Sequence, residues 1–203
     1  MTGKGVLLAL EGVDGSGKTT QAHLLAEALK ERGLPVVLTQ EPSAGPAGQQ
    51  LRRYLGGPTR HLSPVAELAL FVADRREHVA QEINPGLAAG QVVITDRYYY
   101  SSVAYQGALG LDPARILADN EAFAPRPQLV FILTLPPDLA VTRLAHSPGR
   151  RRQVSEDQDY LERVAAIYAS LHGPHIHRVD AAASPEAIHA QLLTITLKAL
   201  DLA

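Results

Sequence analysis

The sequence contains no cysteine, which excludes disulfide bonds and thiol chemistry and fits a reducing compartment. It also lacks an apolar run long enough to cross a membrane, and its first residues lack the pattern of a secretory signal. We therefore expect a cytoplasmic protein that has no membrane partner.

An excess of positive charge is missing as well. The 19 Lys and Arg residues are opposed by 21 Asp and Glu residues, which gives a formal net charge of −2. General nucleic-acid-binding proteins are usually basic, so we expect no nucleic-acid partner. The chain has 203 residues, of which 46% are hydrophobic, so we expect residues 1–203 to form a single domain with a continuous core.

The most informative motif present is Gly-x-x-x-x-Gly-Lys-Thr at residues 12–19, here called the phosphate loop. Its glycines let backbone N–H groups converge on phosphates, Lys18 reaches the terminal phosphates, and the hydroxyl of Thr19 can bind Mg²⁺. A strand pattern at 6–10 precedes the loop, and a helical pattern at 21–32 follows it. We expect a nucleoside triphosphate to contact Gly12, Val13, Asp14, Gly15, Ser16, Gly17, Lys18, Thr19 and Thr20.

The rest of the chain alternates short apolar runs with helical patterns. Further buried strands are predicted at 35–39 and 92–95, and two more strands are predicted at 129–135 and 176–179. Several helices open at Ser-Pro or Asp-Pro pairs, and the one that starts at Ser63-Pro64 is expected to run to a break at Asn84-Pro85-Gly86. This order predicts an α/β fold with a five-stranded parallel sheet and helices on both faces.

Phosphate loops occur in ATPases, GTPase switches and kinases, so other residues must decide the reaction. The chain has no Asn-Lys-x-Asp element to read guanine. Asp96 ends a predicted strand, either as a Mg²⁺ ligand or as a cap of the next turn, and Arg97 stands where water-splitting ATPases usually carry Glu. Arg52, Arg75 and the arginines at 150–152 add positive charge from separate segments. Facing phosphates need such charges, so the sequence favours phosphorylation of a nucleotide or another small metabolite.

From about residue 7 to 180 the chain resembles the thymidylate kinases. The resemblance rests on linked motifs: the phosphate loop, Glu41-Pro42, Phe71-x-x-x-Arg75, Asp96-Arg97-Tyr98, and Ser101-Ser102-x-x-Tyr105-Gln106-Gly107. It implies the P-loop kinase fold, a homodimer, and transfer of the γ-phosphate of Mg-ATP to dTMP, which gives dTDP for dTTP synthesis. The alternatives are a kinase for a different nucleoside monophosphate or an ATP-binding module without turnover.

The resemblance also implies roles for individual residues. It makes Lys18, Asp96, Arg97 and Arg152 catalytic and gives Thr19 and Asp96 to Mg²⁺. Its dTMP-binding residues are Asp14, Glu41, Pro42, Arg52, Phe71, Arg75, Arg97, Ser102, Tyr105 and Gln106.

Phe71 and Arg75 stand four residues apart, so a helix places them on one face. In the family this aromatic ring stacks on thymine and the guanidinium binds a carbonyl of the base. The alternatives are a core position for Phe71 and, for Arg75, a surface ion pair. The acidic residues that could form this pair are Glu67, Asp74 and Glu82.

The phosphate loop contains no basic residue besides Lys18. In family members of this kind the catalytic arginine comes from a mobile lid, which corresponds here to about residues 146–157. Arg152 matches that arginine, although the register among Arg150, Arg151 and Arg152 is open by one residue. The alternative is a solvated basic loop. The chain also departs from the family pattern at Ser43-Ala44, where two glycines are common.

Overall fold

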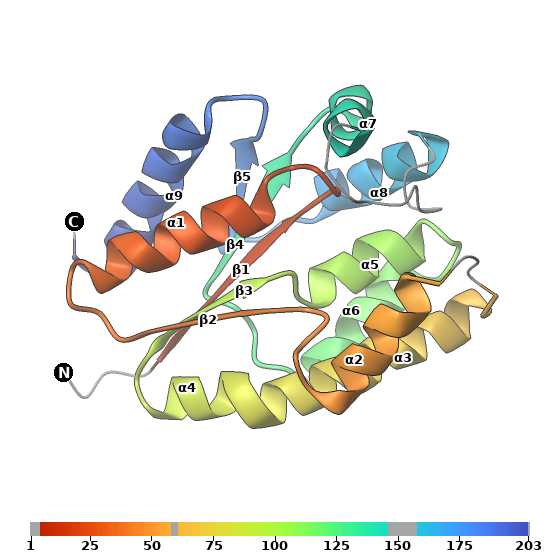
Figure 1. Ribbon diagram of the computed structural model, residues 1–203, viewed down its shortest axis with the longest axis horizontal. Coiled ribbons are helices and arrows are strands. Elements are labelled where there is room, and N and C mark those ends of the chain that lie inside the picture. Colours follow the sequence, from red (N-terminus) through yellow and green to blue (C-terminus); the bar gives the residue numbers. More distant parts are fainter. Residues whose placement is uncertain (1–4, 58–60, 146–157, 203) are drawn as a thin grey trace.

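The computed structural model describes residues 5–57, 61–145 and 158–202. These residues form one sheet of five parallel strands in the order β2-β3-β1-β4-β5 (Figure 1). The strands are β1 (Val6–Gly12), β2 (Val36–Gln40), β3 (Val92–Asp96), β4 (Leu129–Thr134) and β5 (Ile176–Asp180). The predicted five-stranded α/β fold is confirmed, and every strand ends within two residues of its predicted bounds.

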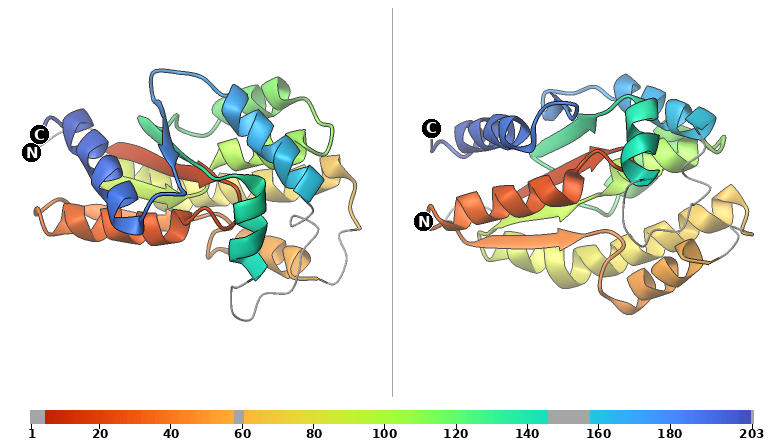
Figure 2. Two further views of the ribbon diagram at one scale, coloured as in Figure 1. Left: turned by 90° about the horizontal axis from the view of Figure 1, so that it is seen from above. Right: turned by 45° about the horizontal axis from the view of Figure 1, so that its top comes forward.

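Helices cover both faces of the sheet, which is why the central strands β1, β3 and β4 are nearly continuous apolar runs. On one face α1 (Lys18–Lys30) packs against α9 (Pro185–Ala199), as Figures 1 and 2 show. On the other face α4 (Asn84–Ala88) packs against β3, and α5 (Tyr99–Gly107) packs against β1. The remaining helices are α2 (Pro46–Leu55), α3 (Pro64–His78), α6 (Pro113–Glu121), α7 (Pro137–Ala145) and α8 (Gln158–Ser170). No helix among the described residues is long and apolar enough to span a membrane.

The helix that starts after Ser63 does not break where we expected. A π-helical turn, η1 (Val79–Ile83), follows α3 and leads directly into α4. The predicted break at Asn84-Pro85-Gly86 is therefore wrong. Pro85 is accommodated because it lies in the first turn of α4, where its missing backbone N–H is not needed.

The parallel strands bring their carboxyl ends to one edge of the sheet. Leu10 of β1 and Gln40 of β2 both pair with Asp96 of β3. The phosphate loop after β1, Glu41 after β2 and Arg97 after β3 therefore meet at this edge, where open α/β sheets bind their ligands.

Gly12 lies where the backbone of the phosphate loop passes close to β4. Its φ is +138°, and a Cβ atom built there would lie 2.5 Å from the backbone oxygen of Leu133 in β4. Only glycine can connect β1 to the loop at this separation.

We expect Gly12→Ala to lower the free energy of unfolding by about 2–4 kcal/mol, because the added Cβ strains the backbone and overlaps the Leu133 carbonyl. Urea unfolding followed by circular dichroism measures the loss. Gly33→Ala is the matched control, since Gly33 has a φ of +77° but a Cβ there would meet no atom within 4 Å. It should cost only about 1 kcal/mol. Equal losses in the two variants would contradict the importance of the close approach.

Candidate active site

The phosphate loop presents one buried ammonium group beside its backbone. Gly15 and Gly17 adopt φ values of +82° and +90°, which favour glycine. The Nζ atom of Lys18 donates to the carbonyl of Val13 at 2.8 Å. Burial and the nearby positive charge of Arg97 lower the pKa of Lys18 to about 8. The charge of this lysine is therefore sensitive to pH just above neutrality.

Thr19 and Asp96 form a site that fits Mg²⁺. The hydroxyl of Thr19 donates to Oδ2 of Asp96. Oδ1 of Asp96 is buried and has no hydrogen-bond partner among the described residues. Both residues line a cavity of about 160 Å³ with His23, Thr39 and Gln40. A partnerless carboxylate oxygen beside a hydroxyl suits Mg²⁺, which prefers oxygen ligands and usually completes its shell with phosphate and water.

Two further observations bear on this site. The described part of the chain contains no group of three or more His, Cys, Asp or Glu side chains that could hold a metal ion. The carboxylate of Asp96 accepts from Thr19 and from no backbone N–H of the described residues, so the alternative of a turn cap is wrong.

Arg97 joins the phosphate loop to α5. It adopts a φ of +73°, which is uncommon for a residue other than glycine. Its guanidinium contacts the carboxylate of Asp14 and donates to Oγ of Ser101 at 3.1 Å. The same group lies 5.3 Å from the centre of the Tyr105 ring, and the Tyr105 hydroxyl accepts from the backbone N–H of Asp14 at 3.0 Å. These contacts fix the start of α5 against the loop.

Glu11 is a buried residue of the site that we did not predict from the sequence. Its carboxylate accepts from the backbone N–H groups of Tyr98 and Ser101 at 2.8 and 3.2 Å. It also accepts from the hydroxyls of Ser101 and Tyr168 at 2.6 and 2.9 Å. Burial raises the pKa of Glu11, although these hydrogen bonds and the charge of Arg97 favour the carboxylate. An acidic residue at the end of an apolar strand was the signal that could have revealed it.

Arg75 and Glu41 form a buried ion pair. Arg75, on α3, is 0% exposed. Its Nη2 and Nε atoms lie 2.6 and 3.0 Å from Oε2 of Glu41. Nη2 also donates to Oγ of Ser102 at 3.1 Å, and Nη1 donates to Oδ1 of Asn120 at 2.7 Å. Burial alone would raise the pKa of Glu41, but the charge of Arg75 lowers it. The alternative of a surface ion pair for Arg75 is therefore wrong.

The other residues predicted to bind the acceptor lie around this ion pair. Phe71 is half-buried and stands outside the core cluster, so its alternative as a core residue is wrong. Gln106 donates to Glu67 at 3.1 Å, and its Oε1 is buried without a partner among the described residues. Arg52 is exposed and donates to the carbonyl of Pro42. Because α3 packs against both α2 and α5, these side chains all lie around the ion pair of Arg75 and Glu41.

The departure from the family pattern at Ser43 has a structural explanation. The Ser43 hydroxyl and backbone N–H donate to Oδ1 of Asp74 at 2.6 and 3.1 Å. Asp74 is buried on α3, and this burial raises its pKa. The backbone N–H of Ala47 donates to Glu77 of the same helix at 2.8 Å. Ser43 thus helps to hold the loop that carries Glu41.

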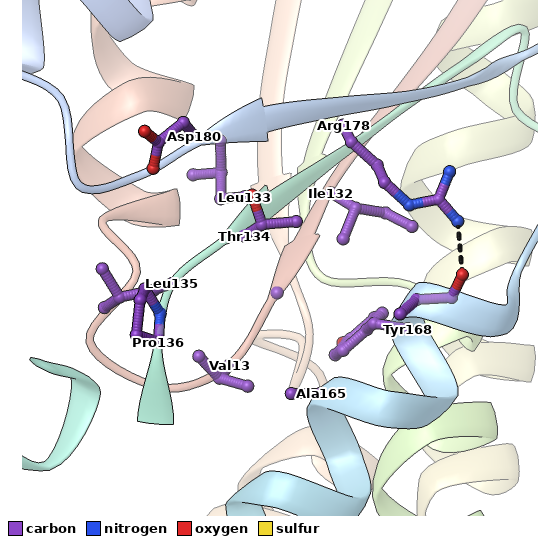
Figure 3. Close-up of a pocket in the computed structure, with 12 residues that line it drawn as sticks. Val13, Ile132, Leu133, Thr134, Leu135, Pro136, Ala165, Tyr168, Arg178 and Asp180 are labelled. Carbon is purple, nitrogen blue, oxygen red and sulfur yellow. Dashed lines mark hydrogen bonds between the residues drawn. The ribbon is translucent and has the colours of Figure 1, made fainter. Parts of the chain in front are cut away.

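A larger cavity, of about 410 Å³, lies between the phosphate loop, β4, β5 and α8 (Figure 3). Gly12 and Val13 form part of its wall, and Tyr168 lines it while its hydroxyl reaches Glu11. Arg178 adds a positive charge, but its guanidinium donates to a backbone carbonyl of α8 at 2.8 Å. The walls of this cavity are mostly apolar.

The predicted lid, residues 146–157, lies outside the described residues. Arg152, Arg150 and Arg151 all belong to it. The catalytic role of Arg152 therefore stays a prediction.

The chain is similar to known proteins over nearly its whole length. A family profile described as "Thymidylate kinase" matches residues 10–192. A protein named "Thymidylate kinase" from Xanthomonas campestris pv. campestris is 46% identical over 200 residues, which cover 98% of this chain and 86% of the relative. A protein of the same name from Desulfotalea psychrophila is 40% identical over 199 residues, which cover 98% of each chain.

The lowered pKa of Lys18 predicts that affinity for a nucleoside triphosphate falls as the pH rises through about 8. The sign follows from charge: the protonated amine attracts the phosphates and the neutral amine does not, so each pH unit above the pKa should cost up to about tenfold. Calorimetric titrations from pH 7.5 to 9.5 measure this fall. Lys18→Arg, which stays charged throughout, should show weaker binding without the fall. A flat profile for the native protein would contradict the prediction.

Proposed function

Because the chain belongs to the thymidylate kinase family, we propose that it transfers the γ-phosphate of Mg-ATP to dTMP. The products are dTDP and ADP, and the reaction is a step of dTTP synthesis. The observation that carries the proposal is the junction at Arg97. This residue contacts Asp14 of the phosphate loop and Ser101 of α5, so one cation lies between the donor region and the region that we assign to the acceptor.

The donor is held by the phosphate loop. Lys18 would contact the terminal phosphates, and Thr19 and Asp96 would hold Mg²⁺; the buried position of Lys18 in the loop and its neighbour Thr19 beside Asp96 support this assignment. Bound Mg²⁺ neutralises charge on the donor phosphates. Phosphoryl transfer depends mainly on positioning and on such neutralisation, so the chain itself needs no nucleophile.

The acceptor base is assigned to the region of Phe71 and Arg75. The ring of Phe71 is available for stacking, since it is not packed in the core. The charge of Arg75 is balanced by Glu41, so its guanidinium acts as an oriented donor rather than as a phosphate-binding cation. This property suits the carbonyl of a neutral base.

The phosphate and sugar of dTMP are assigned to the neighbouring residues. Arg97 and Arg52 would neutralise the acceptor phosphate. Asp14 would contact the 3′-hydroxyl of the sugar. Tyr105 and Gln106 would leave no room for a 2′-hydroxyl and would so exclude ribonucleotides. The contact of Arg97 with both Asp14 and Tyr105 supports this arrangement, because it fixes the cation beside the residues assigned to the sugar.

We further propose that Arg152 supplies the transition-state charge from a lid at about 146–157. The phosphate loop supports this assignment, since Lys18 is its only basic residue. Family membership is the support for a single-domain protein that forms a homodimer and acts in the cytoplasm.

A substrate panel tests the proposed reaction. Coupled ADP-release assays with dTMP, dUMP, dCMP, dGMP, AMP and UMP should give the highest kcat/KM for dTMP. The missing methyl group should make dUMP about 10- to 200-fold poorer but still detectable. Reactions without an acceptor give the background. ATP binding without dTMP turnover would contradict the proposal, and a preference for another monophosphate would reassign the acceptor.

The assignment of Arg152 predicts that Arg152→Ala lowers kcat by about 10³- to 10⁵-fold, because transition-state charge would be left unbalanced. The dissociation constant for ATP should change little. Arg150→Ala and Arg151→Ala are the matched controls and should keep most activity. Loss of activity in Arg151→Ala alone would assign the catalytic role to Arg151 instead of Arg152. Native activity in all three variants would refute a catalytic arginine in this segment.

A further inference from the structure

The Arg75 guanidinium has one N–H group that the described residues do not use. A guanidinium carries five N–H groups. Nε and one Nη2 hydrogen face Glu41, the other Nη2 hydrogen faces Ser102, and one Nη1 hydrogen faces Asn120. The second Nη1 hydrogen has no acceptor in the described parts of the chain. Because Arg75 is 0% exposed, this donor calls for a partner other than bulk water.

Asn120 fixes the direction of that donor. It lies on α6, is 1% exposed and does not belong to any motif of the sequence. Its Oδ1 accepts from Nη1 of Arg75 at 2.7 Å, while its Nδ2 donates to the carbonyl of Ile116 at 2.8 Å. Rotating the amide by half a turn would place N–H groups against the guanidinium and oxygen against oxygen. The network therefore permits one orientation of the amide.

We propose that Asn120 is a positioning residue that sets base specificity. Together with Glu41 and Ser102 it holds the plane of the guanidinium, and the second Nη1 hydrogen is left for an acceptor atom on the base. The charge of Arg75 is already balanced by Glu41, so this single N–H donor, rather than the positive charge, recognises the base. It selects a base with a carbonyl at C4, such as thymine or uracil, over cytosine, whose C4 amino group is itself a donor. The inference rests on the proposed function.

Asn120→Leu and Asn120→Asp form a matched pair for the test. Each has nearly the shape of asparagine, and each loses the hydrogen bond to Ile116, but only Asp keeps an acceptor for Nη1. The difference between the two reports on an acceptor for Nη1, and the melting temperature reports the cost of the carboxylate that Asp adds beside Glu41. The measurements are kcat and KM for dTMP, dUMP and dCMP, and the melting temperature.

In Asn120→Leu we expect the dTMP:dCMP ratio of kcat/KM to fall about tenfold, through a higher KM for dTMP. Asn120→Asp should keep most of that ratio. The dTMP:dUMP ratio should stay unchanged in both, because the methyl group distinguishes those substrates. Ile116→Val, a core change on the same helix, should lower the melting temperature without changing either ratio.

An unchanged dTMP:dCMP ratio in Asn120→Leu would overturn the inference, as would an equal loss in Ile116→Val. If Asn120→Leu does not fold, Asn120→Ala serves as the acceptor-free variant with the same criteria. Native protein that fails to turn over dTMP would refute the proposed function instead, so the two failures are distinguishable.

Discussion

The contact between Arg97 and Asp14 is the interaction on which the geometry of the site depends. An acidic side chain in a loop built for anions opposes the binding of phosphate, and the adjacent guanidinium offsets that effect. Arg97 reaches this position because β3 ends beside β1 and the backbone turns through a left-handed conformation. The carboxylate of Glu11 holds the residues that follow Arg97, because it accepts hydrogen bonds from the backbone N–H groups of Tyr98 and Ser101. The donor loop and α5 are therefore placed relative to each other by the carboxylates of Glu11 and Asp14 and the guanidinium of Arg97.

Arg75, the other arginine of the site that pairs with a carboxylate, lies in a different electrostatic environment. Its side chain and that of Glu41 are 1% and 4% exposed, whereas those of Arg97 and Asp14 are 20% and 15% exposed. A buried ion pair seldom adds net stability, because desolvation offsets the attraction, but removing one partner is costly. The ion pair is better explained by the orientation that it gives to the guanidinium of Arg75. It fixes a planar group of N–H donors without adding net charge to the region assigned to the base.

Local sequence patterns predicted the strands, the phosphate loop and the strand-end position of Asp96, because each depends on residues close together in the chain. They could not identify the partner of Arg75, since Glu41 is 34 positions away and Asn120 is 45 positions away. The role of Glu11 depends on Tyr168, which is 157 positions away. The π-helical turn after His78 was missed for another reason, because Pro85 looked like the end of a helix although it lies in the first turn of α4, where proline is tolerated. What escaped prediction was thus the pairing of buried polar groups across the fold.

The pairing of Arg75 with Glu41 has a consequence for how the protein responds to ionic strength. Mobile ions screen exposed charges over about 8 Å at physiological salt, and they act much less on a neutral, buried pair. Added salt should weaken the hold of exposed Arg52 on an anionic group while leaving the donors around Arg75 almost unaffected. With the acceptor roles proposed for Arg52 and Arg75, a change of ionic strength would alter how much acceptor is bound, but hardly which base is chosen.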